Sequence, residues 1–99
     1  MWFRSRGSRS RPVELVLYSK PGCHLCEEMM VVVDRVIGKG GGVPATVREV
    51  DISQDSELSA VYAEQIPVLF VNGRKAFKFR LTEEALRDRL KKEEGSAPA

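Results

Sequence analysis

The sequence contains no long hydrophobic run, since none of its apolar stretches approaches the roughly 18 residues that a membrane-spanning helix needs. Its 99 residues are enough for one domain with a single modest core and too few for two. The shares of hydrophobic and charged residues, 42% and 30%, are those of an ordinary globular protein. We therefore expect one soluble domain with no membrane contact and with its active site at the edge of one core.

A large surplus of charge is also missing. The formal net charge is only +2, although the N-terminal stretch is basic and has no acidic residue. Outside that stretch the chain has twelve basic and fourteen acidic side chains. A slightly acidic body argues against a nucleic-acid-binding face, so we expect no nucleic-acid partner. The basic side chains of the N-terminal stretch are Arg4, Arg6, Arg9 and Arg11.

The N-terminal stretch, residues 1–11, also lacks the apolar segment of a secretory signal. Its Arg and Ser residues predict a disordered basic tail before a domain at residues 12–93, and residues 94–99 predict a flexible C-terminal tail. We expect a cytoplasmic protein. A mitochondrial presequence is the alternative, because it shares the lack of acidic residues, although Gly7 disfavours the amphipathic helix that it needs.

Cysteine is scarce, and the only two, Cys23 and Cys26, stand together in "SKPGCHLC". In a reducing compartment such a pair is more often catalytic or metal-binding than structural, and two inert core thiols are the third reading. A structural zinc site needs four ligands, whereas this pair and the neighbouring His24 offer three at most. No second cysteine cluster exists, so we expect no metal site.

The remaining pattern predicts seven secondary-structure elements. Residues 13–18 are rich in Val and Leu, as in a mostly buried strand, and Pro21 and Gly22 end that strand. A Gly-rich loop at residues 38–44 ends the helix that follows. Predicted strands cover residues 13–18, 45–52, 66–71 and 74–79, and predicted helices follow Gly22, Ser53 and Thr82, with Ser53 and Thr82 as caps.

These elements predict an α/β fold of order β-α-β-α-β-β-α. A helix between the first two strands makes a βαβ unit, whose strands run parallel. Asn72-Gly73 is typical of a type I′ hairpin turn, so the last two strands pair antiparallel, with Phe77 and Phe79 on one face. The expected result is a four-stranded mixed sheet flanked by three helices.

Cys23 falls at the first turn of the first helix, where unpaired N–H groups and the helix dipole stabilise a thiolate. Such positions lower a cysteine pKa from about 8.5 to between roughly 3.5 and 7.5. Cys23 then becomes the better leaving group when a mixed disulfide is resolved. Cys26, one turn on and beside the apolar stripe, is placed to be the resolving thiol. The stripe consists of Leu25, Met29, Val32, Val33 and Val36.

The strand–"SKPGCHLC"–helix junction, the segment "QIPVLFVNG" and the closing helix resemble the glutaredoxin branch of the thioredoxin fold over residues 13–92. The resemblance implies a thioredoxin-like (glutaredoxin) fold and a thiol–disulfide oxidoreductase. In that family the first cysteine attacks and the second resolves, which implies catalytic roles for Cys23 and Cys26. It also implies no tightly bound cofactor, with glutathione as a candidate reductant.

The resemblance further implies where a disulfide substrate binds. Ile66-Pro67 is expected to be a cis peptide whose backbone pairs with the substrate, with Gln65 beside it. Lys20 stands where the family often has a lysine, and its charge would stabilise the thiolate or meet a substrate carboxylate. His24 is a second candidate for tuning the Cys23 pKa, and an ordinary surface pair with Glu28 is its alternative.

Two positions depart from familiar glutaredoxins. Leu25 replaces a Tyr before the second cysteine, and "FKFR" at residues 77–80 replaces a Gly-Gly step; in the family the amides of that step help to hold the γ-glutamyl end of glutathione. The chain is in this respect similar to a small glutaredoxin-like group that has a CxxC motif and no Gly-Gly step. Glutathione and a thioredoxin-type reductase both remain candidate reductants.

We expect disulfide-containing proteins as substrates and a monomeric chain. The alternative from another class is a non-catalytic, thioredoxin-fold binding module that presents Ile66-Pro67 and a basic hairpin to a protein partner. Its sign would be a cysteine pair that does not cycle between dithiol and disulfide. The basic hairpin consists of Arg74, Lys75, Lys78 and Arg80.

Overall fold

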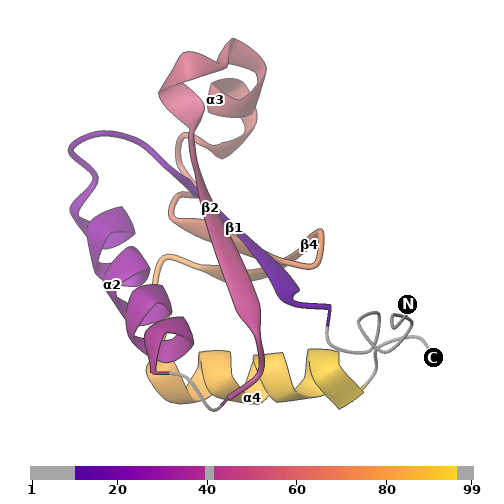
Figure 1. Cartoon of the computed structure of the whole chain (residues 1–99). Helices are drawn as coiled ribbons and strands as arrows, with labels where there is room; N and C mark the ends of the chain where they lie inside the picture. The colour runs from indigo at the N-terminus through magenta and orange to yellow at the C-terminus, as the bar shows by residue number, and fades with distance from the viewer. Residues whose placement is uncertain (1–10, 40–41, 96–99) are drawn as a thin grey trace.

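The computed structural model describes residues 11–39 and 42–95. The predicted tails therefore lie mostly outside the described residues. The element order confirms the predicted β-α-β-α-β-β-α arrangement, with one added 3-10 turn, η1 (Figure 1). The elements are β1 (Val13–Ser19), α2 (His24–Gly38), β2 (Ala45–Asp51), η1 (Ile52–Gln54), α3 (Ser56–Tyr62), β3 (Val68–Val71), β4 (Arg74–Lys78) and α4 (Glu83–Gly95).

The four strands form one mixed sheet in the order β2-β1-β3-β4. β1 pairs in parallel with β2 and antiparallel with β3, and β3 pairs antiparallel with β4, as predicted. Asn72 and Gly73 have φ angles of 49° and 83°, the left-handed pair of values that a type I′ turn requires. Within the described residues, no helix is long and apolar enough to cross a membrane.

Asn72 also fastens the hairpin to the rest of the domain. Its backbone N–H donates to the Glu14 carbonyl at 2.8 Å, and its side-chain oxygen accepts from the Glu14 N–H at 2.9 Å. The side-chain amide donates to Glu93 of α4 at 2.9 Å. One residue of the turn therefore joins the hairpin to β1 and to the last helix.

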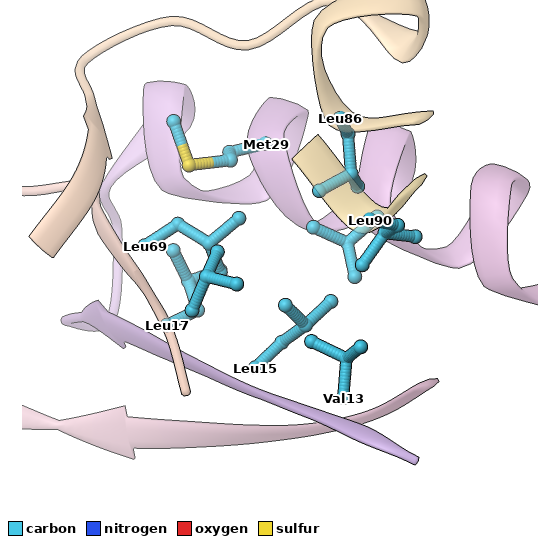
Figure 2. Packing of buried hydrophobic residues seen from close by; sticks show 9 residues of the cluster. Val13, Leu15, Leu17, Met29, Leu69, Leu86 and Leu90 are labelled. Carbon is cyan, nitrogen blue, oxygen red and sulfur yellow. The ribbon is translucent and has the colours of Figure 1, made fainter. Parts of the chain in front are cut away.

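The main core lies between one face of the sheet and helices α2 and α4. Alternate residues of β1 turn to this face, because successive strand side chains point to opposite sides. Figure 2 shows Leu15, Leu17 and Leu69 of the strands facing Met29 of α2 and Leu86 of α4. The buried members of this cluster are Val13, Leu15, Leu17, Met29, Val33, Leu69, Val71, Leu86 and Leu90.

An aromatic cluster occupies the other face, where α3 meets the sheet. The ring of Tyr18 lies 4.9 Å from that of Tyr62 and 4.8 Å from that of Phe70, measured between centroids. The Lys75 ammonium lies 5.6 Å from the Tyr62 ring centroid. The rings attach α3 to the end of β1 from which the chain enters the cysteine motif, so this cluster helps to position the site.

The predicted start of the second helix is wrong by two residues. Ser53 lies in η1, and its hydroxyl donates to Asp51 at 2.6 Å instead of capping α3. Asp55 is the cap, since its carboxylate accepts from the N–H groups of Glu57 at 2.9 Å and Leu58 at 3.1 Å. A carboxylate is the stronger acceptor at the positive end of a helix, which explains why the helix begins after Asp55.

The ends of two other elements also differ from the prediction. β3 begins at Val68, so Ile66-Pro67 precedes the strand instead of opening it. β4 ends at Lys78, so Phe77 is partly buried against the core while Phe79 lies beyond the strand and is 42% exposed. The shared face predicted for Phe77 and Phe79 is therefore wrong. α4 continues to Gly95, past the predicted domain boundary at residue 93.

Glu83 connects the first turn of α4 to the end of α2. Its carboxylate lies 2.8 Å from Arg87, 3.6 Å from Lys39 and 3.7 Å from Arg35. The hydrogen bond from Arg87 lowers the pKa of Glu83 below its ordinary value of 4.5, and the charge of Lys39 adds to this, whereas desolvation opposes it. A carboxyl whose pKa falls on folding stabilises the fold above pH 4.5 and loses that contribution as the pH drops through its folded pKa.

Replacing Glu83 by glutamine should therefore lower the thermal midpoint at pH 7 by a few degrees at most, because exposed ion pairs contribute little. The difference from the unaltered chain should vanish once the pH is low enough to protonate Glu83. Glu84→Gln is the matched control, since Glu84 is exposed and has no ion pair among the described residues. Calorimetry from pH 2 to 8 measures both; an equal loss in the two variants would contradict the assigned role of Glu83.

Candidate active site

The turn between β1 and α2 places Cys23 at the start of the helix. Gly22 has a φ of 78°, a left-handed value that glycine adopts without steric cost, and the Cys23 N–H donates to the Lys20 carbonyl at 3.3 Å. Cys23 is the N-cap of α2, and its carbonyl accepts the first helical bond, from Glu27, at 3.1 Å. Its sulfur accepts from the N–H of Cys26 at 3.2 Å. A side chain in this position satisfies an N–H group that the helix leaves unpaired.

Cys23 and Cys26 form a disulfide across this first turn, with their Cα atoms 5.2 Å apart. Cys26 is 1% exposed, whereas Cys23 is half-buried. The burial of Cys26 agrees with its predicted position beside the apolar stripe of the helix. An attacking thiol from solution reaches the Cys23 sulfur more easily than the Cys26 sulfur.

A second, smaller apolar cluster brings the disulfide beside the Ile66-Pro67 peptide, which is cis. Ile66 is 8% exposed and Pro67 less than 2%. These residues lie about forty positions from the cysteines in sequence, so only the folded sheet joins them. The buried members are Cys26, Ile52 and Ile66, and Tyr18, Cys23, Leu58 and Tyr62 pack against them.

The backbone around the cis peptide is partly engaged. The Ile66 N–H donates to the Tyr62 carbonyl at 3.1 Å, and the Pro67 carbonyl accepts from the Phe79 N–H at 2.8 Å. Among the described residues, none donates a hydrogen bond to the Ile66 carbonyl. That carbonyl is therefore a backbone acceptor without a partner among the described residues, directly before the cis-proline.

Lys20 and His24, two predicted site residues, stand next to the cysteines in the chain. Within the described residues, neither side chain forms a hydrogen bond or an ion pair with a cysteine. Lys20 is exposed at the start of the turn that leads to Cys23. His24 has an 83% exposed side chain whose Nε2 lies 3.3 Å from Glu28 and whose Nδ1 lies 3.7 Å from Glu27. The surface pair with Glu28, the alternative for His24, is therefore present. The tuning roles of Lys20 and His24 stay predictions.

Gln65 directs its side chain toward other parts of the domain. The side-chain amide donates to the Val61 carbonyl at 2.9 Å, and its oxygen accepts from the Lys75 ammonium at 3.2 Å. The Gln65 N–H donates to the Tyr62 carbonyl at 2.8 Å. Gln65 thus ties the turn before Ile66 to α3 and to β4.

The sequence interpretation missed two features of this region. Ser19, 4% exposed, ends β1 and donates its hydroxyl to Glu49 of β2 at 2.8 Å; a Ser closing an apolar strand was the only sequence signal for it. The other is a groove of about 220 Å³ next to the cysteine motif. Its lining residues are Leu25, Glu28, Met29, Val32, Phe79, Arg80, Leu81 and Thr82.

Metal ligands do not gather in the described part of the chain, where no group of three or more His, Cys, Asp or Glu side chains could hold an ion. A mixed four-stranded sheet, a disulfide across the first turn of the first helix and an adjacent cis-proline define a thioredoxin-like protein with a CxxC pair.

Comparison with known proteins gives the family. Residues 14–91 match the glutaredoxin-like domain (DUF836), and the chain belongs to this family. A search of curated proteins found no match.

Solved structures agree with this assignment. An X-ray structure of a structural-genomics target protein from X. campestris is 26% identical, with a TM-score of 0.63, and the match covers 79% of this chain and 96% of that one. The solution structure of a protein from Nitrosomonas europaea is also 26% identical, with a TM-score of 0.65 and coverage of 80% and 92%. A mutant thioredoxin from Halobacterium salinarum NRC-1, 19% identical, shares the fold with a TM-score of 0.61 over 92% of this chain and 82% of its own.

Proposed function

We propose that this protein is a thiol–disulfide oxidoreductase in which Cys23 is the nucleophile and Cys26 the resolving thiol. The observation that carries the proposal is the closed Cys23–Cys26 disulfide, with one sulfur reachable and the other buried, beside the cis Ile66-Pro67 peptide. Inert core thiols would both be buried and would not cap a helix. The unequal exposure instead supports a separate step for each sulfur.

The proposed reaction starts from the reduced dithiol. The Cys23 thiolate attacks one sulfur of a substrate disulfide, so that a Cys23–substrate bond forms and the other substrate sulfur leaves as a thiolate. The Cys26 thiolate then attacks the Cys23 sulfur, which releases the second substrate thiolate and closes the Cys23–Cys26 bond. Two electrons pass from the dithiol to the substrate, and the protons of Cys23 and Cys26 end on the two substrate thiols.

Helix α2 favours both steps. The N–H of Cys26, 3.2 Å from the Cys23 sulfur, and the positive end of the helix dipole stabilise negative charge on that sulfur. The stabilisation matters when Cys23 attacks as a thiolate and again when Cys23 leaves from a mixed disulfide. Two thiols of a reductant, for which glutathione is a candidate, reopen the Cys23–Cys26 bond and become a disulfide themselves.

The substrate contacts that we propose are those that the fold leaves available. The Ile66 carbonyl accepts a substrate N–H, Pro67 shapes the wall behind it, and Lys20 meets a substrate carboxylate. Gln65 acts as a positioning residue, since its side chain holds the turn that precedes Ile66.

A redox titration of the purified full chain tests the proposal. Across a range of ratios of reduced to oxidised glutathione, we expect a reversible loss of two hydrogens with one midpoint, read by thiol trapping and intact mass. A dithiol–disulfide couple passes two electrons, so about 30 mV should change the ratio of the two forms tenfold. If both thiols remained free at strongly oxidising ratios, a non-catalytic binding module would be the better account.

A further inference from the structure

Phe79 adopts a backbone conformation that is unusual for a bulky residue. Its φ is 71°, and the N–H of Arg80 donates to the Lys78 carbonyl at 2.8 Å across it. A hydrogen bond between residues i and i+2 around a positive φ is typical of a γ-turn of the rare, strained form. Strain of this kind persists only where surrounding structure holds it, and it concentrates at functional sites.

The surrounding structure holds Phe79 beside the cysteine motif. Its N–H is bonded to the carbonyl of Pro67 at 2.8 Å, which extends the pairing of β3 and β4 by one bond past the cis peptide. The ring is nevertheless 42% exposed, so burial in the core does not explain why an aromatic residue occupies this turn. The turn positions an exposed aromatic side chain in a groove that Leu25 of the cysteine motif also lines.

The groove lies between this turn and the first turns of α2. Leu25, which stands between Cys23 and Cys26 in sequence, forms part of its wall, so the groove adjoins the cysteine motif although neither cysteine lines it. Five of its eight lining residues are apolar, and about 220 Å³ is enough for one large side chain but not for a folded element. The apolar members are Leu25, Met29, Val32, Phe79 and Leu81.

Two cations without an ion pair lie at the Phe79 side of the groove. Arg80 forms part of its wall and Lys78 precedes Phe79; both are exposed, neither forms an ion pair within the described residues, and the Lys78 ammonium lies 5.3 Å from the Phe79 ring centroid. Glu28, the acidic residue of the groove wall, already lies 3.3 Å from His24. An acidic partner is therefore the electrostatic complement of this surface.

We propose that this groove docks a large apolar side chain of an acidic protein segment that carries the substrate disulfide. The inference rests on the proposed function and names the substrate class of that site. Glutathione lacks a large apolar side chain and would leave the groove empty. Phe79 thus selects protein disulfides, and the flanking cations select the acidic ones.

Single-turnover reactions of the pre-reduced full chain test this selection. The substrates are three disulfide-linked peptides of equal length: one with Leu beside the cysteine and Asp at its flanks, one with Ala in place of the Leu, and one with Lys in place of the Asp. Bis(2-hydroxyethyl) disulfide, small and neutral, reports the chemistry alone. We expect the Leu–Asp peptide to react roughly ten-fold faster than the Ala peptide, because burying about half of a Leu side chain changes a rate by that factor. It should also react faster than the Lys peptide, because the Lys flanks are repelled by Lys78 and Arg80. The ratio of the Asp-peptide rate to the Lys-peptide rate should fall towards one at high salt, because salt screens the charges.

Phe79→Gly removes the ring and keeps a backbone that glycine adopts freely, so the melting temperature should not fall. It should reduce the ratio of the Leu-peptide rate to the Ala-peptide rate to near one. Lys78→Glu combined with Arg80→Glu should reverse the preference between Asp and Lys flanks. Val31→Ala is the matched control, since Val31 is a 47% exposed apolar residue of α2 that does not line the groove. The rates of this variant should match those of the unaltered chain.

Equal rates for the three peptides, with normal reaction of the small disulfide, would overturn the docking proposal and leave the proposed function intact. A dimer in sedimentation that Phe79→Gly dissociates would also overturn it, because a second copy of the chain would then fill the groove. No reaction with any disulfide, the small one included, would remove the proposed function and the docking proposal together.

Discussion

Cys23→Ser should lower the rate of disulfide reduction by more than about 10³-fold, because serine at neutral pH cannot replace the thiolate that attacks the substrate. Cys26→Ser should give a different result. Its Cys23 still attacks, but nothing displaces the substrate, so a mixed disulfide accumulates. The different burial of Cys23, half-buried, and Cys26, 1% exposed, is the structural reason for this division of roles.

Intact mass after mixing with a disulfide-linked peptide measures both results. One peptide adduct per chain should appear with Cys26→Ser, none with Cys23→Ser, and dithiothreitol should reverse the adduct. The double replacement of Cys23 and Cys26 is the background control. An adduct that forms with Cys23→Ser and not with Cys26→Ser would reverse the assigned roles.

Leu17→Ala should produce the largest loss of stability that we predict. Leu17 is 0% exposed at the centre of the main cluster, where Figure 2 shows it beside Leu69 and opposite Met29. Truncation removes buried methyl groups and leaves a cavity that the strand backbone cannot close. We expect a cost of about 2–5 kcal/mol in the free energy of unfolding and a fall of roughly 10–25 °C in the melting temperature.

Denaturant titration and thermal melting of the reduced and the oxidised protein measure this loss. Val61→Ala is the control, because Val61 is 58% exposed on α3 and its truncation should change the free energy of unfolding by less than about 0.5 kcal/mol. A loss for Leu17→Ala as small as that for Val61→Ala would mean that Leu17 is not packed as the structure shows.

Local signals in the sequence predicted much of the fold. Thr82 caps α4 as expected, since its hydroxyl accepts from the Ala85 N–H at 3.1 Å. The Asn72-Gly73 pair is the turn between β3 and β4, and the CxxC motif lies where β1 gives way to α2. Each of these features depends on residues within a few positions of one another, which is why spacing and residue type were sufficient.

Errors arose where neighbouring residues compete for the same role. Ser53 and Asp55 are both good caps, and Asp55 caps α3 because its carboxylate is the stronger acceptor while Ser53 lies in the 3-10 turn at Ile52–Gln54. Alternation along residues 74–79 suggested one strand face for Phe77 and Phe79. In the structure the strand ends at Lys78 and the chain turns at Phe79. The Phe79 N–H bonds there to the carbonyl of Pro67, which lies twelve residues earlier in the chain, so no local pattern indicated the turn.

The sequence by itself identified the candidate redox centre of this protein, because its two cysteines stand together at a predicted helix start. It also determined the element order, through turn residues and the periodicity of apolar positions. The family resemblance implied a cis Ile66-Pro67 peptide near the pair, whereas the groove beside it appeared only in the tertiary structure. The cis Ile66-Pro67 peptide and the groove beside Phe79 come from segments about forty to fifty residues away. Their approach depends on the pairing of β1 with β3 and on the burial of one shared core, which no local pattern specifies.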